Sequence, residues 1–319
     1  MKPWSPYFDL GFVYQTLYLG FDPITLSVFD TLQPIIEDDF FQAIELTKIE
    51  DPVHNNKIKK LIEKAGKSVV FSGVTPIFRE GLNLSDLSEE KRKNAVQRLF
   101  PLFDEAHEFN ARVFLIASGP DPGKAQRENA KEQLKHSIMD LWEYGEKLNY
   151  NKDTTLSMEI FDRDVEIRFL FGPTAEASQF VRALRAFGIN FSLTIDQGHL
   201  YLLKEEPSHS LHEAKGLAFH FHLGNCVVKD TKNPAFGAKH PVFGFPGGEV
   251  GYREISSFLS LLKGNQYFDQ GSHSGRPILS FEVRPVIGEG PIQIFHDSKE
   301  EFLIGWNDFK NSLQKEEGR

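Results

Sequence analysis

Short apolar runs alternate with longer amphipathic segments along the whole chain, a pattern typical of strand and helix units repeated around a parallel sheet. Eight apolar runs have the length of strands, near residues 11–18, 41–47, 68–74, 112–118, 154–161, 189–196, 217–224 and 277–284. Helical periodicity is clearest at 57–66, 88–109, 125–148 and 174–187. Eight such units predict a (β/α)8 TIM barrel. A doubly wound open sheet is less favoured, because no Gly-x-Gly-x-x-Gly turn follows an early strand.

The predicted barrel occupies the whole chain. Its 319 residues are 40% hydrophobic and include 29 Phe, which is enough apolar material for one large core. Proline and glycine cluster at 119–123 and 241–251, where strands are expected to pass into loops rather than where two domains would be linked. We therefore expect a single TIM-barrel domain over residues 1–319, ending in a short polar tail at 314–319.

Charge and cysteine content narrow the class of protein further. The net charge of −9 disfavours a nucleic-acid partner or an anionic membrane surface. The single cysteine, Cys226, cannot form an internal disulfide, and the first residues lack the apolar run of a signal peptide. No stretch approaches the roughly 18 apolar residues of a spanning helix. The sequence thus predicts a soluble, cytoplasmic protein.

The last four predicted strands each divide into a polar and an apolar face when residues are taken with a period of two. In the first of these four, Ser157 and Glu159 share one face, while Leu156, Met158 and Ile160 share the other. A barrel strand turns its large apolar side chains toward the helices, so the polar faces should point into the barrel. Each polar face ends in a side chain able to bind a metal, namely Glu159, Asp196, His222 and Glu282. These lie near the carboxyl ends of the strands, where barrel enzymes place their active sites.

Three buried carboxylates at one barrel mouth need a cation or a proton to coexist. A set of two Glu, one Asp and one His is rich in oxygen donors and suits Mn²⁺ or Mg²⁺, with Co²⁺ or Zn²⁺ also accommodated. Any one of these residues alone would more often be a helix cap or loop anchor. His220 shares the face of His222 but lies deeper, and we interpret it as a hydrogen-bonded neighbour of the ligands. Glu45 ends the polar face of the second predicted strand and could approach the site, but as a lone acid it is interpreted as structural.

The segments around these residues resemble the four metal-site segments of the xylose isomerase-like sugar isomerase and epimerase superfamily, and most closely those of the ketose 3-epimerases. The matching segments are 158–163, 195–199, 219–225 and 280–283. The resemblance implies that Glu159, Asp196, His222 and Glu282 hold one divalent metal ion. It also implies that Glu159 and Glu282 act as the catalytic acid and base, and that Arg163 and His199 contact substrate oxygens.

The implied reaction is epimerisation or isomerisation of a sugar, sugar phosphate or keto-polyol. A metal that holds a carbonyl and the neighbouring hydroxyl oxygen stabilises the enediolate formed when the adjacent carbon loses its proton. A carboxylate on either side can remove that proton and return one elsewhere. Where ketose epimerases usually carry an arginine, segment 225–230 offers only Lys229, which leaves the substrate open. The insert through His240 and residues 244–248 is a candidate lid or phosphate cradle.

Three alternatives remain at this stage. A phosphodiesterase similar to endonuclease IV would need further metal-binding histidines, and strands 2 to 4 contain none. A keto-polyol dehydratase would share the proton-abstraction step. A non-catalytic metal- or sugar-binding barrel would not need the paired Glu159 and Glu282. The expected partner is a small sugar or polyol, and homo-oligomerisation is left open.

Overall fold

The computed structural model describes residues 2–18, 27–150, 152–269, 275–286 and 288–317. Eight strands form one sheet in the order β1-β8-β7-β6-β5-β4-β3-β2, and all its ladders are parallel. The strands are β1 (Asp9–Phe12), β2 (Ala43–Leu46), β3 (Ser68–Ser72), β4 (Ala111–Ala117), β5 (Thr155–Glu159), β6 (Phe191–Asp196), β7 (Ala218–Gly224) and β8 (Ile278–Glu282). The predicted TIM barrel is confirmed.

The barrel closes between β1 and β2 through sparse pairing. The amide of Gln42 donates to the carbonyl of Leu10 at 2.7 Å, and Val13 forms an isolated parallel bridge with Glu45. On the other side of β1 a continuous ladder runs from Asp9 to Phe12 along β8. We call the junction of β1 and β2 the seam of the barrel.

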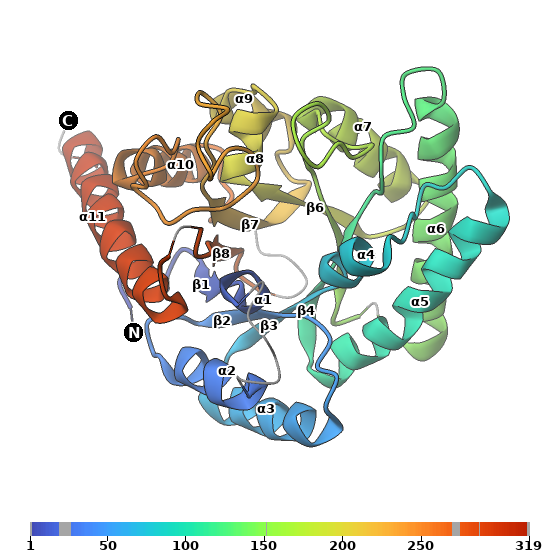
Figure 1. Cartoon of the computed structure of the whole chain (residues 1–319), viewed down its shortest axis with the longest axis horizontal. Coiled ribbons are helices and arrows are strands. Elements are labelled where there is room, and N and C mark those ends of the chain that lie inside the picture. The colour runs from blue at the N-terminus through green and yellow to red at the C-terminus, as the bar shows by residue number, and fades with distance from the viewer. Residues whose placement is uncertain (1, 19–26, 151, 270–274, 287, 318–319) are drawn as a thin grey trace.

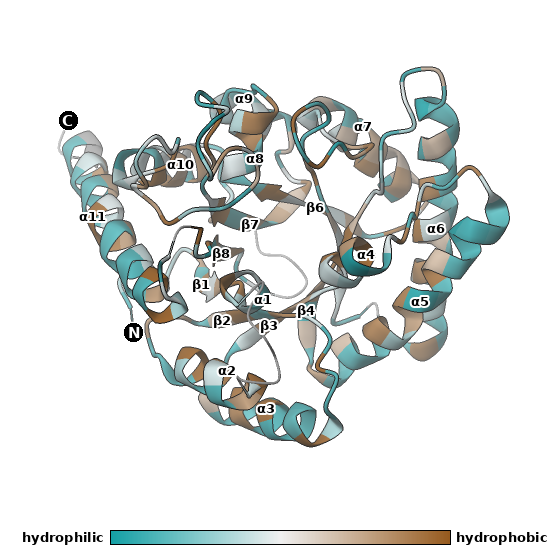
Figure 2. Cartoon of the chain, viewed as in Figure 1, coloured by the Kyte–Doolittle hydropathy of each residue, from teal (hydrophilic) through white to brown (hydrophobic). Residues whose placement is uncertain are grey.

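Helices surround the strands (Figure 1). They are α1 (Tyr14–Leu17), α2 (Val28–Glu37), α3 (Pro52–Ala65), α4 (Val74–Glu80), α5 (Glu89–Glu108), α6 (Arg127–Leu148), α7 (Thr174–Ala186), α8 (Gln197–Leu202), α9 (Pro207–Glu213), α10 (Tyr252–Gly264) and α11 (Pro291–Glu317). Figure 2 shows hydrophobic and hydrophilic positions alternating around the longer helices, as expected where one helix face packs against a sheet. Within the described residues, no helix has the length and apolar character needed to cross a membrane.

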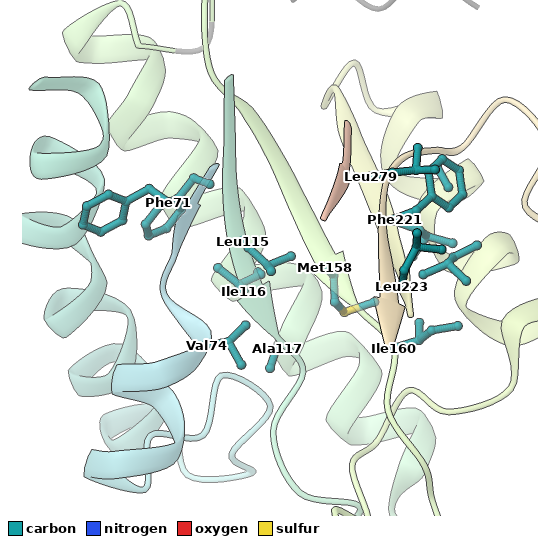
Figure 3. Packing of buried hydrophobic residues seen from close by; sticks show 14 of the residues in the cluster. Phe71, Val74, Leu115, Ile116, Ala117, Met158, Ile160, Phe221, Leu223 and Leu279 are labelled. Carbon is teal, nitrogen blue, oxygen red and sulfur yellow. The ribbon is translucent and has the colours of Figure 1, made fainter. Parts of the chain in front are cut away.

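The outward faces of the strands build the core between the sheet and the helices. Leu156, Met158 and Ile160 of the segment around β5 are fully buried in one large hydrophobic cluster. Figure 3 shows part of this cluster, to which Phe71 and Leu223 contribute from β3 and β7. The predicted division of β5 is therefore confirmed, since its apolar face packs outward and its polar face is left for the barrel interior.

The predicted bounds of the first strand were wrong. The first strand was expected at 11–18, but β1 ends at Phe12 and Tyr14–Leu17 form helix α1. A short apolar run does not distinguish a strand from a buried helical turn. Within the polar tail at 314–319, the residues up to Glu317 belong to α11, because Lys, Gln and Glu are good helix formers. Residues 318–319 of that tail lie outside the described residues.

Candidate active site

The strands bring the predicted ligands to one mouth of the barrel. Glu159, Asp196 and Glu282 are the last residues of β5, β6 and β8, and the ladder pairs Asp196 with His222 of β7. Gly224 ends β7 beside them, and a Cβ atom there would lie 2.2 Å from Oδ2 of Asp196. A glycine at this position therefore leaves the space that the Asp196 carboxylate occupies.

Three of the four predicted ligands are in direct contact. Nδ1 of His222 lies 3.2 Å from Oε1 of Glu159 and 2.8 Å from Oε2 of Glu282. One potential ligand atom from each of these three residues falls within 4.8 Å of the others. The fourth predicted ligand, Asp196, is connected to these three residues through Glu282. Potential ligand atoms of Asp196, His240 and Glu282 also lie within 4.8 Å of one another. Glu282 is thus common to both groups.

The residues present fit a divalent cation. Oδ1 of Asp196 accepts the amide of His199 at 2.8 Å, whereas the buried Oδ2 has no hydrogen-bond partner among the described residues. The side chains of Glu159 and His222 are also buried. A buried carboxylate oxygen without a donor is costly unless a cation or proton neutralises it. Carboxylate oxygens and one imidazole nitrogen are suitable ligands for such an ion.

The paired glutamates differ in proton affinity. Burial raises the pKa of Glu159 to about 7, opposed by His222 and reinforced by Glu282. Burial would also raise the pKa of Glu282, but the imidazoles of His240 and His222 outweigh it and hold that pKa well below its usual value. Burial disfavours a charge on His222, yet Glu45, Glu282 and Glu159 together raise its pKa.

Glu45 belongs to this site. It was interpreted from the sequence as structural, but its Oε2 lies 2.9 Å from Nε2 of His222 and 3.4 Å from Nε2 of His220. Gln15 donates to its other oxygen at 3.1 Å. The signal was present in the sequence, because Glu45 alternates with the outward-facing Ile44 and Leu46 on β2. Contact with His222 could not be inferred without the closed barrel.

His220 lies below the predicted metal ligands in a chain of polar side chains. Its Nδ1 is 3.1 Å from Oγ1 of Thr194, which is 2.8 Å from Oγ of Ser157, and its Nε2 is 3.5 Å from Oγ of Ser280. Burial lowers the pKa of His220 well below its usual value. A neutral ring is consistent with its predicted place as a hydrogen-bonded neighbour of the ligands.

The two residues expected to contact substrate are placed differently. His199 is buried, with Nε2 3.6 Å from Oε1 of Glu159, and burial lowers its pKa to about 3. The guanidinium of Arg163 instead donates to Glu176 of α7 at 3.0 and 3.1 Å and to the carbonyl of Leu170 at 2.6 Å. The structure therefore brings His199, but not the guanidinium of Arg163, into contact with Glu159.

Comparison with known proteins gives a family match and similar folds. A family model described as xylose isomerase-like TIM barrel matches residues 17–267. A D-tagatose 3-epimerase-like protein is 15% identical, with a TM-score of 0.68 and coverage of 96% of this chain and 99% of the other. An L-ribulose 3-epimerase is 16% identical, with a TM-score of 0.68 and 97% of each chain covered. The 3-keto-D-glucoside 4-epimerase of E. coli is 15% identical, with a TM-score of 0.64 and coverage of 92% and 98%. No curated protein matches the sequence.

Proposed function

Because the chain belongs to the xylose isomerase-like TIM barrel family, we propose that it is a divalent-metal-dependent isomerase or epimerase of a sugar, sugar phosphate or keto-polyol. The observation that carries the proposal is the pair Glu159 and Glu282, which contact the same nitrogen of His222, with the unpaired Oδ2 of Asp196 in the neighbouring group that shares Glu282. The similar folds named as ketose and keto-sugar epimerases support the same substrate class.

The metal would be held by Glu159, Asp196, His222 and Glu282, with His222 contributing Nδ1. Their oxygen-rich donor set favours Mn²⁺ or Mg²⁺ and also accommodates Co²⁺ or Zn²⁺. When bound, such an ion supplies a Lewis acid for the carbonyl and neighbouring hydroxyl oxygens of a ketose.

The protein's own residues move the protons. One carboxylate of the pair Glu159 and Glu282 accepts the proton from the carbon next to the carbonyl, and the electron pair of the broken C–H bond moves toward the carbonyl oxygen. A proton then returns to the planar carbon skeleton from that carboxyl group, or from its partner, which takes up one proton from solvent in each cycle while the first carboxyl group releases one. Return to the opposite face of the same carbon gives an epimer, whereas return to the neighbouring carbon gives an isomer. Neutral His199 would hydrogen-bond a substrate oxygen, and Arg163 holds the segment after β5 against Glu176.

The direct test is uptake of deuterium from D₂O into carbon-bound positions of candidate ketoses, sugar phosphates and keto-polyols in the presence of Mn²⁺. The proposed enzyme exchanges the proton next to the carbonyl whatever its final product is. Loss of one water from the product would identify a dehydratase. Cleavage of a phosphodiester without carbon exchange, or binding of a sugar without exchange, would refute the proposal.

A further inference from the structure

The segment between β7 and α10, residues 225–251, places a fifth side chain at the active site. His240 lies in this insert and its side chain is buried. One of its ring nitrogens lies within 4.8 Å of ligand atoms of Asp196 and Glu282. The sequence indicated a lid or cradle somewhere in the insert, without showing which of its residues reaches the barrel mouth.

The rings of His240 and His199 pack edge to face beside the carboxylates of the site. The two ring centroids are 5.2 Å apart and the ring planes meet at 82°. Nδ1 of each imidazole is buried without a hydrogen-bond partner among the described residues. Leaving a buried polar atom unpaired costs free energy, so two such atoms beside one set of carboxylates indicate a missing polar partner. The hydroxyl groups of a sugar have the matching chemistry, since each can donate and accept.

The backbone holds His240 in a costly conformation. Its φ angle is +45°, in the left-handed region that non-glycine residues rarely adopt. The amide of Arg284, beyond β8, donates to the carbonyl of His240 at 2.8 Å, and Nε of Arg284 donates to the carbonyl of Lys239 at 2.7 Å. Such a conformation persists where the surroundings over-determine it, and it is concentrated at functional sites.

A second anchor comes from the segment after β5. Oε2 of Glu166 accepts the amide of Ala238 at 2.6 Å, and Glu166 also forms an ion pair with Lys239. Together Glu166 and Arg284 tie residues 238–240 to the ends of two other strands. We call these contacts the insert clamp. The clamp fixes the position of His240 relative to the ligands on β6 and β8.

We propose that His240 is a further substrate-binding residue, which hydrogen-bonds a hydroxyl or carbonyl oxygen of the sugar beside His199, and that the insert clamp positions it. This inference rests on the proposed function for the class of substrate. A neutral imidazole offers one donor and one acceptor to a hydroxyl group. Burial lowers the pKa of His240, and the carboxylate of Glu282 opposes that shift.

The test compares His240→Ala and His240→Asn with wild type. The side chain of Asn keeps a donor and an acceptor and tolerates a positive φ, whereas Ala removes both features. We expect kcat/KM to fall about 10- to 100-fold in His240→Ala, mainly through KM, and to recover in part in His240→Asn. The Mn²⁺ dissociation constant should stay within about twofold of wild type, because His240 is not assigned to the metal. His136→Ala, on the exposed face of α6, is the matched control and should change neither value.

Glu166→Gln tests the insert clamp and replaces His240→Ala if that variant does not fold. It keeps an acceptor for the amide of Ala238 but loses the charge that pairs with Lys239, so KM should rise while Mn²⁺ affinity is kept. If His240→Ala folds and its KM equals that of wild type, the proposal is overturned. If His240→Ala does not fold, an unchanged KM in Glu166→Gln overturns it instead. Loss of Mn²⁺ affinity in His240→Ala would also overturn it, because His240 would then be a metal ligand.

Polyol binding measured by calorimetry separates this inference from the proposed function. Binding that depends on His240 in a protein that never exchanges a carbon-bound proton would refute the enzyme and retain the sugar contact.

Discussion

Nε2 of His222 forms a 2.9 Å hydrogen bond with Oε2 of Glu45, a residue 177 positions earlier in the chain. The contact fixes the imidazole so that its other nitrogen faces Glu159 and Glu282. Metal-binding histidines commonly donate their second N–H to a carboxylate, which orients the ring and raises its basicity. Glu45 is therefore a positioning residue for the proposed metal site.

Replacing Glu45 by Gln should weaken Mn²⁺ binding about 10- to 100-fold, because the ring of His222 loses its charged acceptor. Titration calorimetry measures the change. Glu50→Gln, at an exposed position just beyond β2, is the control and should bind Mn²⁺ as wild type does. Equal affinity in Glu45→Gln and wild type would exclude the positioning role.

His222→Ala should lower Mn²⁺ affinity far more than His220→Ala. The first variant removes a ligand, whereas the second removes a ring that bonds Thr194 and approaches Ser280. Both variants should be checked for folding by circular dichroism before titration. If two folded variants lost the same affinity, the assignment of only one histidine to the metal would be wrong.

Glu159→Gln and Glu282→Gln should each abolish deuterium exchange into substrate and leave the fold largely intact. Glutamine has nearly the same shape as glutamate but cannot accept or return the proton. Exchange is followed by mass spectrometry, and the melting temperature reports on the fold. A double Gln variant that still exchanges would show that the two glutamates serve only as ligands.

Mn²⁺ affinity should rise as pH increases through about 7, because Glu159 has a pKa raised to about 7 and the pKa of His222 is also raised. Below that pH both residues carry protons that metal binding must displace, so binding releases protons. Calorimetry at pH about 6.5 in two buffers of different ionisation enthalpy measures the number of protons released when Mn²⁺ binds. Glu159→Gln should release about one proton fewer at low pH. The same count in both proteins would mean that Glu159 does not titrate at the site.

Gly224→Ala should disturb the site without touching a predicted ligand. Its Cβ would lie 2.2 Å from Oδ2 of Asp196, so the carboxylate must move and Mn²⁺ affinity should fall at least about tenfold. Gly264→Ala, at the end of α10 with nothing within 4 Å of the added Cβ, is the matched control. It should leave Mn²⁺ binding unchanged and unfolding within about 1 kcal/mol of wild type. Normal metal binding in Gly224→Ala would place Asp196 outside the metal site.

The strands that carry the predicted ligands could be recognised from the sequence, because polar residues recur at every second position toward the carboxyl ends of β5 to β8, between large apolar residues. Glu45 shows the same alternation, but one acid on one strand does not reveal which residue it faces across a barrel. His240 lies in an irregular segment whose path is set by contacts with Glu166 and Arg284. No periodicity encodes those contacts, so only the folded chain shows that His240 reaches the site.

The seam of the barrel has a consequence for dynamics. Glu45 takes part both in the isolated bridge to Val13 that helps to close the seam and in the hydrogen bond to His222. Local opening is easiest where backbone pairing is sparse. If β2 separates from β1 at this junction, Glu45 moves with it and Nε2 of His222 loses its acceptor. Opening of the barrel at the seam and rotation of the His222 imidazole are then coupled. Substitutions that strengthen the pairing of β1 with β2 would therefore hold the His222 ring in place.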